Sequence, residues 1–249
     1  FLNNMSHDIR TPMNAIIGFS DLAMKDLDDK GKLADYLGKI QNASKHLLSL
    51  INDVLDMSRI ESGKVKLFNV PNHIPDLVTN IRDIVEADIA KKELKASFES
   101  NVQHQNVLCD MLRLSQILLN CVYNAIKLTT EGGNINVDLN EVESSKEGFA
   151  SFELTIKDTG IGMSEEFSKH IFEAFERENT STISGIEGTG LGMTITKNLV
   201  DMMGGDIEVK SKKGEGTEFI ISLTFEIDDN TKYSEDAASI FNLNKETLK

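Results

Sequence analysis

Cysteine is scarce in this chain, and several other signatures of large protein classes are missing as well. The 249 residues include two cysteines, three prolines and 17 glycines. Cys109 and Cys121 stand in apolar sequence without the spacing of metal ligands, which predicts reduced, buried thiols and excludes a disulfide scaffold. The composition is not that of a collagen-like fibre. An apolar fraction of 40% is instead typical of globular cores, and the length suffices for two modest domains.

Long apolar runs and an excess of basic charge are also lacking. No run of about 18 apolar residues and no signal-peptide pattern is present, so we expect no membrane contact by this segment. The formal net charge of −14 at pH 7 disfavours nucleic acid and anionic lipid as partners. Any bound phosphate must therefore meet a local site, such as a helix N-terminus with a few basic residues. Because the sequence begins at Phe1, we expect the cytoplasmic portion of a longer protein that carries membrane or sensor segments upstream.

The N-terminal stretch predicts a helix over residues 1–25 whose histidine lies away from the apolar seam. Apolar residues recur at alternating steps of three and four, as in helices packed in a bundle. They are Leu2, Met5, Ile9, Pro12, Ile16, Phe19 and Ala23. His7 lies off this seam, with Asp8 beside it and Thr11 one turn later on the same face. An exposed imidazole beside a carboxylate is a candidate nucleophile, and a solvated surface histidine is the alternative. Pro12 removes a backbone donor and predicts a bend or hinge.

A charged, glycine-containing turn over residues 26–32 precedes a second predicted helix, residues 33–60, that is apolar on two sides. One stripe runs through Leu37 and Ile51, and the other runs through Leu50. A helix that is apolar on two sides needs partners on both. We therefore expect two hairpins to associate as a four-helix bundle in a homodimer. A monomer packed on its own second domain is the alternative.

A domain boundary is predicted near residues 61–64, where serine and glycine break the helical pattern. Helices and strands are mixed beyond it. The predicted strands are 65–70, 96–99, 107–110, 134–139, 149–157, 206–211 and 217–227. The predicted helices are 74–90, 111–129, 165–175 and one through Ile195, Leu199 and Met202. Residues 176–187 are polar without a clear period, which indicates a mobile loop.

The helix predicted over residues 111–129 carries polar side chains suited to a metal and to phosphates. Asn120 and Asn124 are four residues apart, so their amides lie on one face, and Lys127 lies three residues beyond. Two amides and an ammonium can form a site for a metal and phosphate groups. A solvated helix face is the alternative for these three residues.

Two glycine-containing stretches indicate a close approach of the backbone to a ligand. Asp158 ends a predicted strand and is followed by Gly160 and Gly162, a pattern that can place a carboxylate acceptor in a pocket. The second stretch, residues 188–193, opens a helix, where backbone N–H groups and the helix dipole favour phosphate oxygens. Its spacing is not that of a Walker loop. It also follows a loop rather than a strand, which argues against a dinucleotide-binding fingerprint.

In their order and intervals, these motifs resemble those of bacterial sensor histidine kinases over nearly all of residues 1–227. Residues 7–12 resemble the family's phosphoacceptor box, and residues 120–129 resemble its Asn box. Four later stretches resemble the first glycine box, the phenylalanine box, the second glycine box and the last glycine box; they are residues 158–163, 172–175, 188–193 and 214–219. The sequence departs from the commoner pattern at Cys121, Leu128 and Ala174. These are packing positions, so we expect a change in the rigidity of the lid that this family closes over the nucleotide, and no loss of catalytic activity.

The resemblance implies a fold of two domains. Residues 1–63 would form a helical hairpin for dimerisation and histidine phosphotransfer, paired in a dimeric four-helix bundle. Residues 64–228 would form an α/β sandwich that binds ATP, of the type shared with gyrase, mismatch-repair and heat-shock chaperone ATPases. Residues 229–249 would be an acidic, polar linker.

The resemblance also implies ATP and Mg²⁺ as cofactors and suggests roles by position. Asp158 would accept a hydrogen bond from the adenine amino group, and Thr217 would lie near adenine. Asn124 would ligate Mg²⁺, with Asn120 and Lys127 beside the phosphates. The other nucleotide-binding positions would line the pocket or close a lid over the triphosphate. They are Gly160, Gly162, Arg177, Gly188, Thr189, Gly190, Leu191 and Gly192.

The implied activity is ATP-dependent phosphorylation of His7 and transfer of the phosphoryl group to an aspartate of a response-regulator receiver domain. A histidine with an ordinary pKa of about 6.5 is largely neutral at neutral pH, so its ring is a nucleophile, and Asp8 would accept a hydrogen bond or a proton from it. Thr11 would orient a water that removes phosphate from the receiver, unless it merely precedes Pro12. The receiver is expected in trans or beyond Lys249, as in hybrid kinases. A gyrase-like or chaperone-like ATPase and a dimeric pseudokinase that only relays signals are the alternatives.

Overall fold

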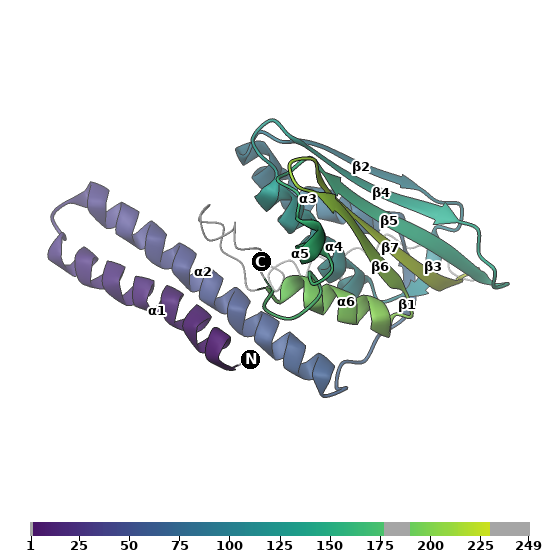
Figure 1. Ribbon diagram of the computed structural model, residues 1–249, viewed down its shortest axis with the longest axis horizontal. Helices are drawn as coiled ribbons and strands as arrows, with labels where there is room; N and C mark the ends of the chain where they lie inside the picture. The colour runs from purple at the N-terminus through teal and green to yellow at the C-terminus, as the bar shows by residue number, and fades with distance from the viewer. Residues whose placement is uncertain (1, 177–189, 230–249) are drawn as a thin grey trace.

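The computed structural model describes residues 2–176 and 190–229, apart from the side chains of residues 2–5 and 7. An N-terminal helical hairpin is followed by an α/β domain, in which helices cover one face of a mixed sheet (Figure 1). Most of the predicted mobile loop over residues 176–187 and nearly all of the predicted linker over 229–249 lie outside the described residues. Within the described ranges, no helix is both long enough and apolar enough to cross a membrane.

Helices α1 (Leu2–Lys25) and α2 (Lys30–Glu61) form the hairpin. The structure confirms helix α1, which continues through Pro12, and Pro12 is buried. Helix α2 begins at Lys30 rather than at the predicted residue 33. It starts earlier because the Asp29 carboxylate accepts hydrogen bonds from the N–H groups of Gly31 and Lys32, each at 3.1 Å, and so caps the first turn.

The two predicted apolar stripes of α2 have different surroundings. Leu50 and Met57 of one stripe are buried, and Tyr36 at its start stacks on Phe19 of α1 with ring centroids 6.2 Å apart. On the other stripe Leu37 is exposed. The helix is therefore apolar on two sides, as predicted, and part of one side is open to solvent in the single chain.

The strands of the sheet are β1 (Val70–His73), β2 (Lys95–Asn101), β3 (Asn106–Cys109), β4 (Asn134–Val142), β5 (Phe149–Asp158), β6 (Asp206–Lys212) and β7 (Gly216–Ile227). Their order is β1-β3-β7-β5-β4-β2, and β6 pairs with the first part of β7. Strands β2 and β4 are parallel, and the other pairs are antiparallel.

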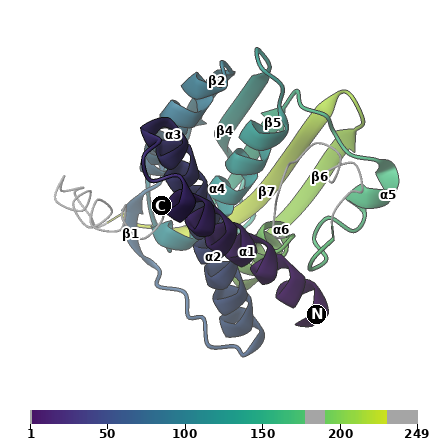
Figure 2. The same ribbon diagram turned by 90° about the vertical axis from the view of Figure 1, so that its left-hand side faces the viewer.

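Helices α3 (Pro75–Lys91), α4 (Met111–Leu128) and α6 (Gly192–Met202) pack on one face of this sheet, with α4 in contact with both of the others. Figure 2 shows the same layer from the side of the hairpin. Cys109 and Cys121 are free and buried, as predicted, and desolvation raises the pKa of each thiol to about 12. Helix α4 contributes ten buried residues to the core, so its position is fixed by packing.

Two predicted elements are wrong in extent. The strand predicted over residues 65–70 is not formed; β1 starts only at Val70, because the Phe68 N–H is donated to the Asp110 carboxylate rather than to a neighbouring strand. Pro71 lies inside β1, where it is tolerated because β1 is an edge strand that pairs only with β3.

The helix predicted over residues 165–175 is one turn, α5 (Glu165–Ser168). Isolated turns follow it, with the His170 N–H bonded to the Phe167 carbonyl oxygen at 2.9 Å. Phe175 adopts a φ of 68°, which is incompatible with a right-handed helix, and donates its N–H to the Gly190 carbonyl oxygen. This contact turns the chain toward the start of α6 instead of extending α5.

Candidate functional site

Strand alternation places Asp158 on the buried face of the sheet. Along β5, Phe152, Leu154 and Ile156 point into the core, and Asp158 follows in the same phase. Its cross-strand partner in β7 is Thr217, which is buried in phase with Phe219. A carboxylate and a hydroxyl thus lie side by side at one end of the core, where the apolar packing stops.

The Asp158 carboxylate uses only one of its oxygens within the protein. Oδ1 accepts hydrogen bonds from the N–H groups of Gly160 at 2.7 Å and Thr217 at 3.3 Å. Among the described residues no group bonds to Oδ2. Desolvation raises the pKa of Asp158 above its ordinary value, and the two N–H donors partly offset this. The two bonds to Oδ1 fix the carboxylate, so Oδ2 can accept a hydrogen bond from a ligand at a defined position.

The glycines after Asp158 allow two backbone segments to come close together. A Cβ on Gly160 would lie 2.7 Å from the carbonyl oxygen of Leu128, the last residue of α4. Gly162 has a φ of 61°, and a Cβ there would lie 2.0 Å from the Lys212 carbonyl oxygen. These close approaches are between parts of the protein's own backbone. They hold the loop after β5 against α4 and the β6–β7 turn.

The two asparagines of α4 point toward the start of α6. Asn120 Nδ2 donates to the Gly192 carbonyl oxygen at 3.1 Å and to Thr196 Oγ1 at 3.2 Å. Asn124 Nδ2 lies 3.2 Å from Met193 Sδ. Helix α6 has no side-chain cap, since its N-cap residue is Leu191. An uncapped helix N-terminus beside two amides suits an anionic group.

The chemistry of the Asn124 side chain is compatible with Mg²⁺. Its Oδ1 makes no hydrogen bond to the described residues and is a hard oxygen ligand of the kind that Mg²⁺ prefers. No group of three or more His, Cys, Asp or Glu side chains that could hold a metal occurs in the part of the chain that the structure describes. A single amide oxygen fits Mg²⁺ all the same, because this ion usually takes its other ligands from water and phosphates.

Among the residues that the structure describes, two buried hydroxyls near this site have no hydrogen-bond partner. They are Thr129 Oγ1, directly after α4, and Thr194 Oγ1, in the first turn of α6. Buried hydroxyls normally find a partner, because an unmade hydrogen bond costs about 1–3 kcal/mol. Their location on either side of the predicted nucleotide-binding residues is consistent with bound water or ligand there.

Helix α4 connects the two groups of predicted site residues. The structure brings Asp158, Gly160 and Thr217 together at the sheet end, and Asn120, Asn124 and Gly192 together at the α4–α6 contact. Gly190 and Leu191 precede α6, and Gly190 packs on Phe175. Arg177, Gly188 and Thr189 lie outside the described residues.

The residues of the predicted phosphoacceptor box lie on α1, away from this site. His7, Asp8 and Thr11 are within the helix, and Thr11 is exposed. Helix α2 runs between α1 and the α/β domain (Figure 1). The structure therefore does not bring the predicted nucleophile together with the predicted nucleotide-binding residues.

Sequence reasoning missed Ser211 and Lys92. Ser211 Oγ bonds to Thr217 Oγ1 at 2.9 Å and accepts from the Met163 N–H at 2.9 Å, so it ties the last glycine stretch to the first. Lys92 bonds to the end of α4. Neither residue lies in a motif, and no local sequence signal could have identified their partners.

Two families of known proteins match separate parts of this chain. Residues 1–63 match the family described as His Kinase A (phospho-acceptor) domain. Residues 109–227 match the family described as histidine kinase-, DNA gyrase B-, and HSP90-like ATPase.

Curated relatives cover most of this chain. The sensor protein GacS of Pseudomonas syringae pv. syringae is 42% identical over 226 residues, which are 90% of this chain and 24% of GacS. The signal transduction histidine-protein kinase BarA of Escherichia coli K12 is 38% identical over 92% of this chain and 25% of BarA. The autoinducer 2 sensor kinase/phosphatase LuxQ of Vibrio harveyi is 37% identical over 90% of this chain and 26% of LuxQ. The chain thus spans about a quarter of the length of these relatives.

Solved structures of histidine kinases are similar in fold to this chain. Full-length ShkA in complex with AMPPNP superposes with a TM-score of 0.65 and 29% identity, over 91% of this chain and 46% of ShkA. The histidine kinase ThkA in complex with the response regulator TrrA superposes with a TM-score of 0.66 and 25% identity, over 88% of this chain and 59% of the matched chain.

Proposed function

The chain belongs to the sensor histidine kinases, as their catalytic core, and from this premise we propose that it phosphorylates His7 from Mg²⁺-ATP and passes the phosphoryl group to a receiver-domain aspartate. One observation carries the proposal: a helical hairpin that bears His7 is joined in one chain to an ATPase domain in which Asp158 and Asn124 offer unengaged oxygens. A gyrase-like or chaperone-like ATPase would not need the hairpin.

The proposed nucleotide position follows from these two acceptors. The adenine amino group would donate to Asp158 Oδ2, because Oδ1 is already held by the Gly160 and Thr217 N–H groups. The triphosphate would lie toward Asn120, Asn124 and the uncapped start of α6. Mg²⁺ bound at Asn124 Oδ1 would supply charge neutralisation to the phosphates.

The phosphoryl transfer itself needs a positioned nucleophile and little covalent chemistry from the ATP-binding domain. A neutral His7 ring nitrogen would form a bond to the γ-phosphorus while the bond to the bridging oxygen breaks and ADP leaves. The ring would lose the proton on its other nitrogen to Asp8 or to water. The reaction then conserves charge, and it produces a phosphoramidate that is labile in acid.

Incubation of the 249-residue chain with γ-³²P-ATP and Mg²⁺ tests the proposal. We expect a labelled protein whose label is lost in acid and retained in base. The variant His7→Gln should bind ATP like the parent but take no label. Release of inorganic phosphate without labelled protein would instead favour the gyrase-like ATPase, and ATP binding with neither product would favour the pseudokinase.

A receiver domain is the proposed partner, in trans or beyond Lys249, and a cytoplasmic location is proposed with it. The relatives LuxQ and ThkA support this part of the proposal, since one is named a kinase/phosphatase and the other was solved with a response regulator. We propose that Thr11, exposed on α1, orients water for removal of phosphate from the receiver.

The variant Thr11→Ala separates this role from a structural one. It should leave the labelling of His7 nearly intact and slow the loss of phosphate from a phosphorylated receiver in the presence of ADP and Mg²⁺. Equal rates for parent and variant would leave Thr11 as a residue that only precedes Pro12.

A further inference from the structure

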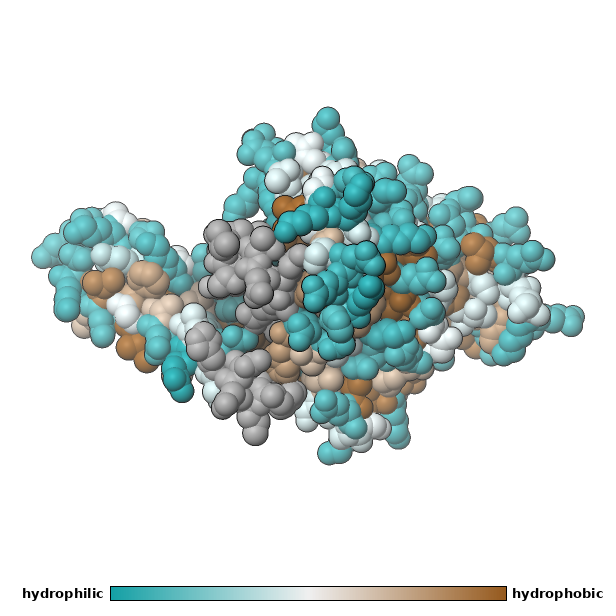
Figure 3. All heavy atoms as spheres, viewed as in Figure 1, coloured by the Kyte–Doolittle hydropathy of each residue, from teal (hydrophilic) through white to brown (hydrophobic). Residues whose placement is uncertain are grey.

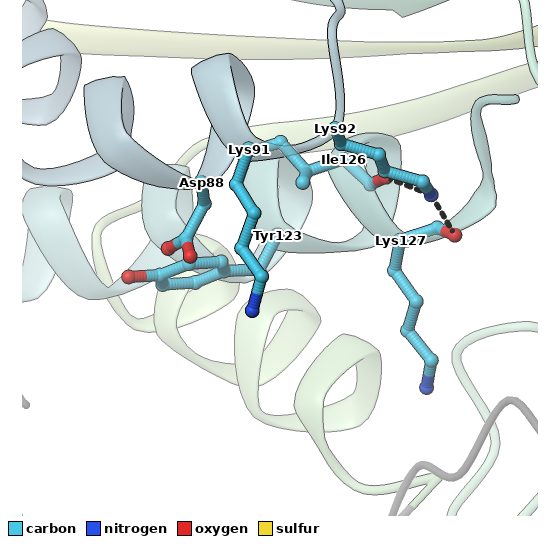
Figure 4. Close-up of a pocket in the computed structure, with 6 residues that line it drawn as sticks. All are labelled: Asp88, Lys91, Lys92, Tyr123, Ile126 and Lys127. Carbon is cyan, nitrogen blue, oxygen red and sulfur yellow. Dashed lines mark hydrogen bonds between the residues drawn. The ribbon is translucent and has the colours of Figure 1, made fainter. Parts of the chain in front are cut away.

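Lys92 joins the end of α3 to the end of α4. It directly follows α3, and its Nζ donates hydrogen bonds to the carbonyl oxygens of Ile126 at 2.6 Å and Lys127 at 2.7 Å. Figure 4 shows the ammonium of Lys92 directed at these two oxygens, beside a pocket of about 470 Å³ between the two helices. Lys92 is half-buried, and desolvation lowers the pKa of its side chain.

These two bonds complete the last turn of α4. The final carbonyl groups of a helix have no partner within the helix, and a cation there also matches the helix dipole. In α4, the Thr129 N–H binds the Ala125 oxygen and the Ile161 N–H binds the Leu128 oxygen. Lys92 supplies the donors for the two carbonyls between them, those of Ile126 and Lys127.

The turn that carries Lys92 is itself held in place. Glu93 has a φ of 54°, a left-handed conformation that a residue with a side chain adopts at a cost of about 1–2 kcal/mol. Its carbonyl oxygen accepts from the Gly132 N–H at 3.1 Å, and the Lys95 N–H donates to the Gly133 oxygen at 2.9 Å. These two bonds join the α3–β2 turn to the turn after α4 and therefore fix the position of the Lys92 backbone.

The side chain of Lys127 extends away from Lys92. In Figure 4 the Lys127 ammonium lies on the opposite side of its own backbone from the two dashed bonds. Lys92 therefore contacts the Lys127 backbone and leaves the Lys127 side chain directed elsewhere. Any effect of Lys92 on a ligand of Lys127 must pass through the position of that backbone.

We propose that Lys92 is a positioning residue for the phosphate end of the nucleotide site, because it fixes the last turn of α4 and so the direction of the Lys127 side chain. This inference rests on the proposed function, in which Lys127 lies beside the phosphates of ATP. Without the two bonds, the last turn of α4 would lose its two inner carbonyl partners and fray, and Lys127 would sample several directions.

Binding calorimetry with Mg²⁺-ATP and with adenosine tests the proposal on the 249-residue chain. Lys92→Met keeps the length and apolar stem of the side chain but removes its donors. We expect about a tenfold weaker affinity for ATP, the size expected for losing charged hydrogen bonds, and an unchanged affinity for adenosine. Lys92→Arg, which keeps charge and donors, should recover most of the ATP affinity. Lys91→Met is the matched control, since Lys91 is exposed on the adjacent position and should bind ATP like the parent.

A double variant shows whether Lys92 acts through Lys127. If it does, Lys92→Met combined with Lys127→Met should bind ATP no more weakly than Lys127→Met alone. Additive losses would overturn the proposal, as would equal losses for ATP and adenosine or a parent-like ATP affinity of Lys92→Met. Should Lys92→Met fail to fold, Lys92→Leu, which also lacks donors, replaces it in the same comparisons and is judged by the same outcomes. A parent chain that binds neither ligand would overturn the proposed function, and this inference with it.

Discussion

The Asp158 carboxylate shows how a single residue can cost stability. Burial raises its pKa, so the folded chain holds this proton more tightly than the unfolded chain does. By linkage, the contribution of Asp158 to stability is most favourable below its unfolded pKa and is lost as the pH rises through the folded pKa. At neutral pH the ionised group therefore opposes folding. Such groups are typical of sites at which function outweighs stability.

Asp158→Asn should therefore separate stability from binding. The amide oxygen can still accept from the N–H groups of Gly160 and Thr217, and the buried charge is gone. We expect a melting temperature at pH 7 that is equal to or above that of the parent. ATP affinity should fall about tenfold or more, because the amide NH₂ would face the adenine amino group as a second donor. A lower melting temperature together with parent-like ATP affinity would contradict both roles.

The placement of a side chain could be predicted from the sequence where local periodicity determines it. Asn120 and Asn124 share a helix face because of their spacing, and Asp158 is at a strand end. Lys92 could not be predicted, since its bonds reach residues 34 and 35 positions away. Such pairing depends on how α3 and α4 pack, which the local pattern does not encode.

At the scale of elements, the joint between Phe175 and Gly190 determines how α6 starts. Both residues have positive φ, 68° and 69°, and they are joined by the bond from the Phe175 N–H to the Gly190 oxygen. A Cβ on Gly190 would lie 2.9 Å from Phe175 Cα, whereas a Cβ on Gly192 would lie 3.8 Å from the Asn120 side chain. Of the two glycines in this motif, Gly190 therefore needs the absence of a Cβ, and Gly192 does not.

This difference predicts opposite effects on stability. Gly190→Ala should lower the free energy of unfolding by about 1–2 kcal/mol, because alanine is strained at positive φ and crowds Phe175. Gly192→Ala lies in a helix and has space, so it should be neutral or stabilising by up to about 1 kcal/mol. Urea denaturation of both variants is the measurement. Equal destabilisation would mean that the Phe175 contact does not hold in solution.

Asp110 links two segments that no local sequence pattern connects. Its Oδ1 caps α4 by accepting from the Arg113 N–H at 3.1 Å, and its Oδ2 accepts from the Phe68 N–H at 3.0 Å. The second bond explains why residues 65–69 are not a strand. Periodicity suggested a strand there because it cannot register a competing side-chain acceptor 42 positions away.

Removal of the Asp110 carboxylate should destabilise the α/β domain. We expect Asp110→Ala to lower the free energy of unfolding by about 2–3 kcal/mol, which combines a lost cap of about 1 kcal/mol with a lost hydrogen bond to a charged group. Asp110→Asn keeps one acceptor and should lose about half as much. Thermal or urea unfolding of both variants tests this, and a full loss in Asp110→Asn would show that the Phe68 bond is the dominant one.

At the scale of the whole molecule, α2 belongs to both domains. Near the C-terminus of α2, the Asp56 carboxylate accepts a hydrogen bond from Gln116 Nε2 of α4 at 2.8 Å. Val54 and Ile60 of α2 pack on the core of the α/β domain. The fold of each domain could be predicted from its motifs. This contact could not, because the apolar stripes of α2 do not reveal which surface they meet.

Another side of the C-terminal half of α2 leaves apolar side chains exposed. Leu48, Ile51 and Leu55 lie at helical spacing and are 57%, 41% and 49% exposed. On α1, Met13 and Ile17 are exposed as well. Figure 3 shows hydrophobic side chains on the surface of the hairpin. A contiguous apolar stripe on a two-helix hairpin is what a four-helix bundle would bury between two copies.

We expect the chain to be a homodimer through this stripe, so that charge placed on the stripe separates the copies. The double variant Ile51→Glu and Leu55→Glu would bury four like charges at the interface of a two-fold dimer, a cost of several kcal/mol. We expect light scattering to give the mass of a dimer for the parent and of a monomer for the variant. Leu27→Glu, in the exposed turn between α1 and α2, is the matched control and should remain dimeric. If the parent is a monomer at micromolar concentration, the exposed stripe does not mediate self-association.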